Sequence, residues 1–351
     1  MTEPRRIRRN PVGKGSVRVG PLMAVPQLLA QLGVDPEEVF RACAIAPSLF
    51  EYSENTISFP EVSRLLQVAV ERTGCEHFGL LIAQHAPPQS MGAVGYLVLS
   101  SPNAHIALEK LIAHLNMQDR GAVVALRIEG NAAIFSYSLL LAGLNRADQI
   151  YAGSIGIGRN LMRGLWGPHW RPDAVTFSFA RPRHIDVYRQ YFGVTPRFDA
   201  PESALIFPAV LLERQLPGAD PFLHRLMAER IAEVSRPAAG DLVDDVRELL
   251  RTGNSVSDYS LPAIASRLGM AERTIKRQLA ANGTSFRVIR DDARYDVSRE
   301  LLEGTKMPIS DIASVLGYAS TAAFTRAFER WSGITPLKWR AGRPALRIPS
   351  R

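Results

Sequence analysis

The chain has 351 residues, of which 46% are hydrophobic and 22% are charged. This length favours two or three domains, and this composition excludes a mostly disordered chain. Cys43 and Cys75 are its only cysteines, and their isolated positions exclude a disulfide-stapled scaffold and fit a reducing compartment.

No apolar run approaches the roughly 18 residues that a membrane span needs, and the basic start of the chain has no apolar segment behind it. We therefore expect neither a membrane span nor a secretory signal, and we expect a cytoplasmic protein.

The net charge of +8 is concentrated at the two ends of the sequence. Residues 1–20 carry +5, residues 21–235 carry −3, and residues 236–351 carry +6. Basic blocks flanking a near-neutral middle indicate a polyanionic partner, although a solvated basic surface is the alternative.

Residues 1–20, which include five arginines, predict a flexible basic arm. Three interpretations of this arm are open: it is disordered, it contacts the DNA minor groove, or it improves solubility. Residues 60–70 then place Val62, Leu65, Leu66 and Ala69 at helical spacing, with Gly74 as a natural stop. Residues 103–117 repeat this helical pattern.

The middle of the chain changes period. Two strands across a tight turn are predicted first, and the later elements are a helix, a strand, a short helix and an extended piece: 122–128, 132–138, 146–163, 174–179, 185–192 and 204–207. We group these in an α+β regulatory domain over residues 21–216. Proline, serine and alanine over residues 217–240 predict a linker, with a helix after Pro221.

The last 100 residues or so contain an internal near-repeat. Ile264-Ala-Ser-Arg-Leu-Gly-Met270 corresponds to Ile312-Ala-Ser-Val-Leu-Gly-Tyr318, and an amphipathic segment follows each copy. In each copy a short helix would end at Gly269 or Gly317, a turn at positive φ would follow, and a second helix would then begin.

Each second helix would bury apolar side chains and expose a polar face. Phe324, Phe328 and Trp331 are expected in the core rather than as stacking surfaces. The expected DNA-contacting positions are Arg273, Thr274, Lys276 and Arg277 in one copy and Thr321, Ala322, Thr325 and Arg326 in the other. Two such helix-turn-helix units predict an all-α domain over residues 241–342 that binds double-stranded DNA, with a tail at 343–351.

The segment from Asp311 to Pro336, with Trp339-Arg340, resembles the signature of the AraC/XylS family of bacterial transcription regulators. The resemblance implies two helix-turn-helix units joined by a long helix, near residues 286–303 here. It also implies activation through contact with RNA polymerase. Residues from about 23 to 216 are similar to the arabinose-binding-type regulatory domain of one subfamily, whose members respond to diverse effectors.

Two positions depart from the family pattern. Ala271 stands where members usually have a serine that caps the first recognition helix, which removes an interaction of about 1 kcal/mol. Ala322 stands where many members carry a longer polar side chain. Arg287, Arg290, Lys338 and Arg340 are expected at the DNA backbone or on the surface, and Arg294 is expected to pair with Asp311 or Glu300 inside the domain.

No catalytic, metal-binding or cofactor-binding arrangement is predicted. The seven histidines are scattered, the glycine-rich stretches lack a phosphate-binding context, and two isolated cysteines do not fit a methyl-acceptor repair protein. Gly156 and Gly158 are expected to let helices pack closely.

We therefore expect a non-enzymatic regulator whose first domain senses a small molecule, forms a homodimer, or does both. A DNA-binding protein that only dimerises through this domain is the alternative. The candidate effector-pocket residues are Tyr96, Phe135, Tyr137, Trp166 and Phe177. An apolar or amphipathic effector such as a fatty acid is favoured, because the region offers few candidates for buried charge.

Overall fold

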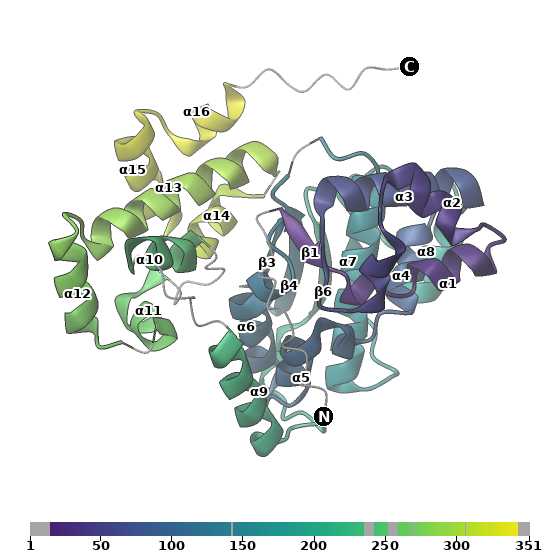
Figure 1. The fold of residues 1–351 in the computed structure, drawn as a ribbon, viewed down its shortest axis with the longest axis horizontal. Coiled ribbons are helices and arrows are strands. Elements are labelled where there is room, and N and C mark those ends of the chain that lie inside the picture. The colour runs from purple at the N-terminus through teal and green to yellow at the C-terminus, as the bar shows by residue number, and fades with distance from the viewer. Residues whose placement is uncertain are drawn as a thin grey trace, which may run out of the picture.

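The computed structural model describes residues 15–141, 143–234, 242–251, 259–268, 270–305 and 307–342. Two hydrophobic cores organise this part of the chain. The first joins side chains between Val17 and Ile231, and the second joins side chains between Leu242 and Trp339. The two units lie side by side, with the helical C-terminal unit next to the end of the other unit where β3 runs (Figure 1). The expected α+β unit and all-α unit are both confirmed.

The first unit is built from helices around a small sheet. Its helices are α1 (Val25–Gln31), α2 (Pro36–Cys43), α3 (Phe59–Thr73), α4 (Phe78–Gln84), α5 (Gly92–Leu99), α6 (Ala104–His114), α7 (Ala147–Trp166), α8 (Ile185–Phe192) and α9 (Pro221–Val234). Short 3-10 helices occupy Gly20–Leu22, Pro47–Glu51, Pro88–Met91, Leu115–Met117 and Ala209–Glu213.

The main sheet has four antiparallel strands in the order β3-β4-β6-β5. The strands are β3 (Ala122–Glu129), β4 (Ala132–Leu139), β5 (Ala174–Thr176) and β6 (Ser203–Pro208). β3 and β4 form the expected hairpin, in which Gly130 adopts a φ of 59° at the turn. A second, two-stranded sheet pairs β1 (Ser16–Arg18) with β2 (Thr56–Ser58).

The local sequence explains where α3 begins and ends and why α7 packs closely against α4. Ser58 and Glu61 form a reciprocal capping box at the start of α3, and Gly74 ends this helix in the left-handed conformation. In α7, a Cβ on Gly156 would lie 2.5 Å from the Cβ of Ala83 in α4, so only glycine permits this close helix contact. The long α7 thereby packs between α4 and the sheet.

Within its described residues, the second unit contains seven α-helices. They are α10 (Leu242–Arg251), α11 (Leu261–Leu268), α12 (Glu272–Ala281), α13 (Phe286–Gly304), α14 (Ile309–Val315), α15 (Thr321–Ser332) and α16 (Pro336–Ala341). The long central helix α13 confirms the expected helix near residues 286–303, and it contacts α10, α14, α15 and α16.

The alternation of side chains along β3 brings the two units together. Val124 and Leu126 face the first core, whereas Val123 and Ala125 pack against the second. On the second face, Arg127 donates from Nη1 to Asp311 Oδ2 of α14 at 2.7 Å. The side chains of β3 therefore pack into the core of the first unit on one face of the strand and against the helical unit on the other.

Two expected boundaries differ from the structure. Within the expected arm, Ser16–Arg18 form β1 and Val19 is fully buried, because their backbone groups pair with β2 and with Gln118. Within the expected linker, α9 packs on α5 and buries Ile231 in the first core. Residues 1–14 and 235–241 lie outside the described residues.

Candidate nucleic-acid interface

Two helix pairs of similar form lie in the C-terminal unit: α11 with α12, and α14 with α15. Gly317, in the turn of the second pair, has a φ of 74°, as its position in the repeat predicts. Gly269, the corresponding residue of the first pair, lies outside the described residues. The central helix α13 separates the pairs in sequence and shares their hydrophobic core.

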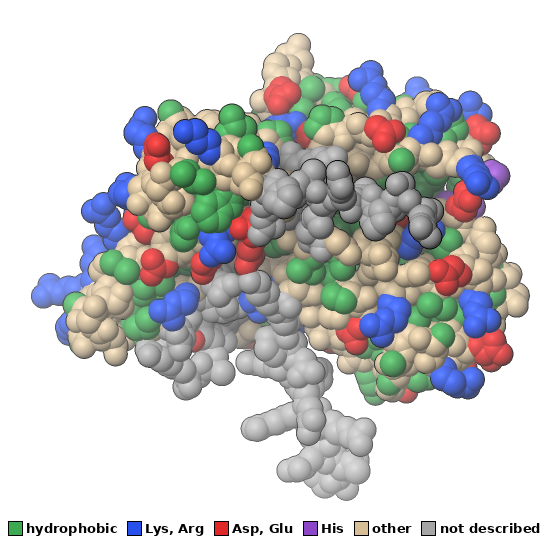
Figure 2. Space-filling model, turned by 90° about the horizontal axis from the view of Figure 1, so that it is seen from above, with side chains coloured by type: hydrophobic (Ala, Val, Ile, Leu, Met, Phe, Trp, Pro, Cys, Tyr) green, Lys and Arg blue, Asp and Glu red, His purple; other side chains and the backbone are tan. Residues whose placement is uncertain are grey.

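Helix α12 buries one face and exposes the other. Ile275 and Leu279 are fully buried in the second core. Arg273, Lys276 and Arg277 are exposed, and Thr274 is half-buried. Lys and Arg side chains line the edge of the molecule formed by the helical unit, where α12 lies in Figure 1 (Figure 2).

Helix α15 has the same two-sided character. Phe324 and Phe328 are fully buried, and Trp331 packs on Tyr295 of α13, so the expectation that these rings belong to the core is confirmed. The predicted contact residues Thr321, Ala322 and Arg326 are exposed, whereas Thr325 is half-buried. The Thr325 hydroxyl donates to the Thr321 carbonyl at 2.9 Å, so its proton is already engaged within the helix.

The two second helices begin differently. The Ser320 hydroxyl accepts a hydrogen bond from the Ala323 amide and caps α15. Ala271, which occupies the equivalent position before α12, provides no side-chain cap. The expected difference between the two helix starts is therefore present, and α12 lacks a stabilising contact that α15 has.

A basic groove of about 410 Å³ lies between α13 and α15. Five arginines and a single aspartate, Asp291, are among its lining residues: Arg287, Arg290, Arg294, Arg326 and Arg330. Arg290 and Arg330 approach Asp291 at 3.5 and 3.6 Å. The buried Nε of Arg290 has no hydrogen-bond partner among the described residues, so the groove retains both net positive charge and a free donor.

Between the described residues, Arg294 does not form the ion pair expected from the sequence. Its guanidinium lies 5.0 Å from the ring centre of Tyr259 and 4.6 Å from that of Tyr318, and it donates to the Gly317 carbonyl at 3.2 Å. Burial lowers its pKa, which is the cost of holding this cation inside the domain. The expected partner Asp311 instead pairs with Arg127 of the first unit.

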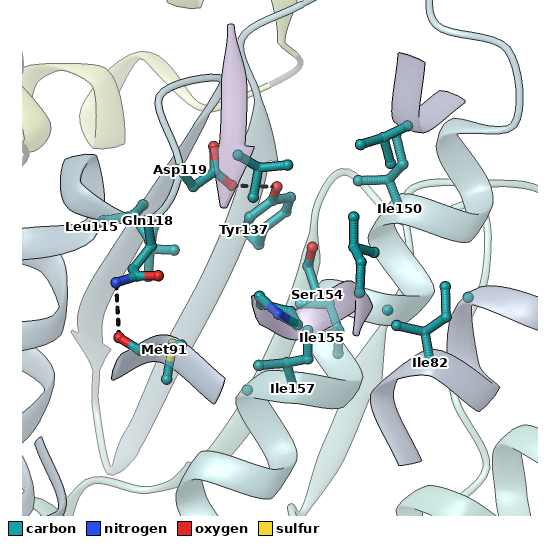
Figure 3. A pocket seen from close by; sticks show the side chains of 18 of the residues that line it. Ile82, Met91, Leu115, Gln118, Asp119, Tyr137, Ile150, Ser154, Ile155 and Ile157 are labelled. Carbon is teal, nitrogen blue, oxygen red and sulfur yellow. Dashed lines mark hydrogen bonds between the residues drawn. The ribbon is translucent and has the colours of Figure 1, made fainter. Parts of the chain in front are cut away.

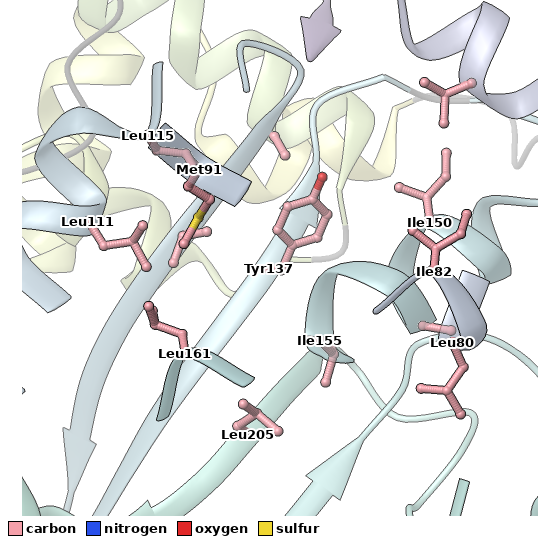
Figure 4. Close-up of a cluster of buried hydrophobic side chains, with 14 of the residues drawn as sticks. Leu80, Ile82, Met91, Leu111, Leu115, Tyr137, Ile150, Ile155, Leu161 and Leu205 are labelled. Carbon is pink, nitrogen blue, oxygen red and sulfur yellow. The ribbon is translucent and has the colours of Figure 1, made fainter. Parts of the chain in front are cut away.

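A cavity of about 140 Å³ lies in the first unit, between the sheet and helices α3, α4, α6 and α7. Its lining is mostly apolar, and the surrounding hydrophobic side chains converge from several elements (Figure 4). Gln118, Asp119 and Tyr137 lie near one end, whereas Ile82 and Ile150 lie at the other (Figure 3). The Tyr137 hydroxyl donates to Asp119 Oδ2 at 2.9 Å.

Asp119, at the polar end of the cavity, is a buried acid. Asp119 is only 7% exposed, and it forms no ion pair within the described residues. Its oxygens accept from the amides of Gly121 and Ala122 as well as from Tyr137. Burial raises the pKa of Asp119 to about 6 despite these hydrogen bonds, and it raises the pKa of Tyr137 as well.

The structure brings together only two of the five candidate effector residues. Phe135 and Tyr137 line the cavity. Tyr96 is 43% exposed on α5, Trp166 packs on Trp170 and Phe207, and Phe177 is buried among other aromatic rings, so these three side chains lie elsewhere.

Sequence reasoning missed the polar residues of the cavity: Gln118, Asp119, Gln149 and Ser154. The sequence does indicate Gln118 and Asp119, because these two polar residues stand between the apolar helix α6 and the apolar strand β3. Gln149 and Ser154 lie on α7, where polar residues are common and carry no comparable signal.

In the described part of the chain, no helix is long and apolar enough to cross a membrane.

Two family models match the chain. The model described as the arabinose-binding domain of AraC transcription regulator, N-terminal, matches residues 33–216, and a helix-turn-helix domain model matches residues 264–342.

Relatives match over nearly the whole chain. An ornithine utilization regulator of Pseudomonas aeruginosa is 27% identical over 90% of this chain and 94% of its own length. The transcriptional regulator VirS of Mycobacterium tuberculosis is 26% identical over 93% of this chain and 96% of its own length. The solved structure of the regulator CdpR from Pseudomonas aeruginosa aligns with a TM-score of 0.48 at 20% identity, covering 92% of this chain and 98% of that one.

The matched relatives are transcription regulators, which are not enzymes, and the helix-turn-helix match lies on the helical unit described above. The chain therefore belongs to the AraC family of DNA-binding transcription regulators.

Proposed function

We propose that α12 and α15 are two recognition helices that enter adjacent major-groove segments on one face of DNA, roughly 34 Å apart. The observation that carries this proposal is the matched exposure of the two helices. Each buries an aromatic or aliphatic face in one shared core and presents arginine to solvent. Arg277 and Arg326 occupy corresponding positions and would contact guanine edges, because arginine matches the O6 and N7 acceptors of guanine.

The neighbouring side chains have supporting roles in this proposal. Arg273, Lys276, Thr274 and Thr321 would contact nearby bases or phosphates. The basic groove between α13 and α15 would hold a DNA phosphate, because Arg290 has a free donor there and arginines outnumber the single aspartate.

Binding-site selection from random DNA with the full chain tests this proposal. Two short motifs about ten base pairs apart are expected. Recovery of salt-sensitive binding without any sequence preference would contradict it, because phosphate contacts alone give that behaviour.

The first unit, in this proposal, senses a small molecule. The cavity supports this role because it is mostly apolar and is provided with a few convergent polar groups. Its contact with the DNA-binding unit supports a regulatory consequence. Val124 of β3 lines the cavity, while Val123 on the opposite face packs against the helical unit.

The contact between the units is both polar and apolar. Arg127 binds Asp311 of α14 and is held by Glu202 and Glu129 of the first unit. An effector that shifts β3 would thereby change the position of α14, which packs on α15. Effector binding and DNA binding would then be coupled reciprocally.

Melting-temperature shifts with a metabolite panel, together with DNA affinity measured with each hit, test the sensor role. Ornithine belongs in this panel, because one relative is an ornithine utilization regulator. A broad panel that shifts neither quantity would favour the alternative, in which the first unit only dimerises. Activation through RNA polymerase is a further prediction that rests on the family resemblance. Homodimerisation and a cytoplasmic location are further predictions that rest on the sequence.

A further inference from the structure

The polar end of the cavity presents hydrogen-bond acceptors and a negative charge. Gln118 is 8% exposed, and its amide nitrogen donates to the Met91 carbonyl at 2.8 Å. Its amide oxygen Oε1 is buried and has no partner among the residues that the structure describes. Asp119 lies next to it in the chain, and both side chains are on the same side of the cavity (Figure 3).

The groups that donate hydrogen bonds to Asp119 do not neutralise its negative charge. Among the described residues, the groups that donate to Asp119 are two backbone amides and the Tyr137 hydroxyl, which are neutral. A buried carboxylate without a cation is unfavourable, and its raised pKa reflects that desolvation. A second anion placed here, such as the carboxylate of a fatty acid, would be repelled. The reason for favouring a fatty acid, a scarcity of candidates for buried charge, therefore does not hold, because Asp119 is a buried acid in the cavity lining.

The rest of the lining is apolar and sets the size of the ligand. Isoleucine, leucine, valine and phenylalanine side chains make up most of the wall, including Ile82, Ile150 and Ile155. The volume of about 140 Å³ is close to that of an engineered cavity of about 150 Å³ that binds benzene. A single ring or a short branched chain therefore fits within this volume.

We propose that this cavity binds a small primary amine, with the ammonium group between Asp119 and the free Gln118 oxygen and an apolar body against the isoleucines. This inference rests on the proposed effector role of the same cavity. The ammonium supplies the cation that Asp119 lacks and the donor that Gln118 lacks. The site adjoins the first residue of β3, since Asp119 accepts from the Ala122 amide.

Isothermal titration calorimetry of the full chain with benzylamine, benzoate and toluene tests the assignment. These probes share one ring and differ in the head group. Benzylamine is expected to bind at least about tenfold more tightly than toluene, and benzoate more weakly than toluene. In Asp119→Asn, the advantage of benzylamine should fall by about tenfold or more while toluene binding persists. Asp173 is an exposed acid outside the cavity lining. Asp173→Asn is therefore the control, and it should change neither benzylamine binding nor toluene binding.

Toluene binding also reports whether the cavity is intact in each variant. Should Asp119→Asn lose toluene binding, Gln118→Met is the second variant and should weaken benzylamine selectively. Toluene binding by the wild type without preference for benzylamine would overturn the head-group assignment and leave the effector site standing. Binding of none of the three probes would overturn both.

Discussion

The Arg127–Asp311 ion pair is the contact between the two units whose energy is most accessible to measurement. The pair joins Nη1 and Oδ2 at 2.7 Å, and its side chains are 22% and 8% exposed. We expect that the variants Arg127→Met and Asp311→Asn, combined in a double-mutant cycle, give a coupling free energy of about 1.5 kcal/mol. Unfolding in urea, followed by circular dichroism, provides the free energies of unfolding.

The magnitude follows from the surroundings of the pair. Unit charges about 4 Å apart attract by roughly 4 kcal/mol at an effective dielectric constant of about 20. Two effects reduce this attraction. Arg127 shares its charge with Glu202 and Glu129, and burial of Asp311 raises its pKa, so desolvation offsets part of the gain.

An exposed pair on α8 is the matched control. Arg189 and Asp186 approach at 3.0 Å, but their side chains are 62% and 79% exposed. The same cycle there, with Arg189→Met and Asp186→Asn, should give less than about 0.5 kcal/mol. Additive effects at Arg127 and Asp311 would show that this ion pair does not stabilise the packing of the two units.

Three further predictions concern stability. Burial raises the pKa of Asp119 in the folded state to about 6, above its ordinary value of 3.8. Its contribution to the free energy of unfolding is therefore complete below pH 3.8 and is lost as the pH rises through 6. Between pH 4 and pH 8, Asp119→Asn should gain up to about 3 kcal/mol in the free energy of unfolding over wild type, measured by urea titration, and a pH-independent difference would contradict this. Gly156→Ala should destabilise by about 1–3 kcal/mol because its Cβ would meet Ala83, whereas Gly158→Ala on the same helix meets side chains only at 3.4 Å and should be neutral or stabilising; equal melting temperatures would refute the packing argument. Ala271→Ser should restore the missing cap of α12 and add about 1 kcal/mol to the free energy of unfolding, and an unchanged value would show that the cap does not form.

Local patterns were sufficient to predict most of the fold. The apolar spacing of residues 60–70, with Gly74 behind it, predicted α3, and the near-repeat predicted the two helix pairs. These features depend on residues within a few positions of each other, so the sequence displays them directly. The two-sided faces of α12 and α15 followed from the same periodicity.

Contacts between distant residues could not be predicted in this way. Arg127 and Asp311 are 184 residues apart, and nothing near either residue indicates the other. The acidic end of the cavity likewise depends on Tyr137 and the start of β3 closing over Asp119. Tyr96, Trp166 and Phe177 were predicted as pocket residues from aromatic and glycine-rich segments. These predictions prove wrong because such composition does not reveal which face of an element a ring lies on.

In the proposed binding mode, α12 and α15 each contact their own segment of DNA. Fluorescence anisotropy of the full chain on its selected site, and on sites altered in one segment, tests it most directly. Arg277→Ala should lose about 1–3 kcal/mol of discrimination in one segment only, and Arg326→Ala should lose the same in the other. Arg189→Ala, exposed on the first unit, should bind as wild type does. Loss of affinity that is uniform across all sites in both variants would contradict the claim, because it would assign these arginines to phosphates.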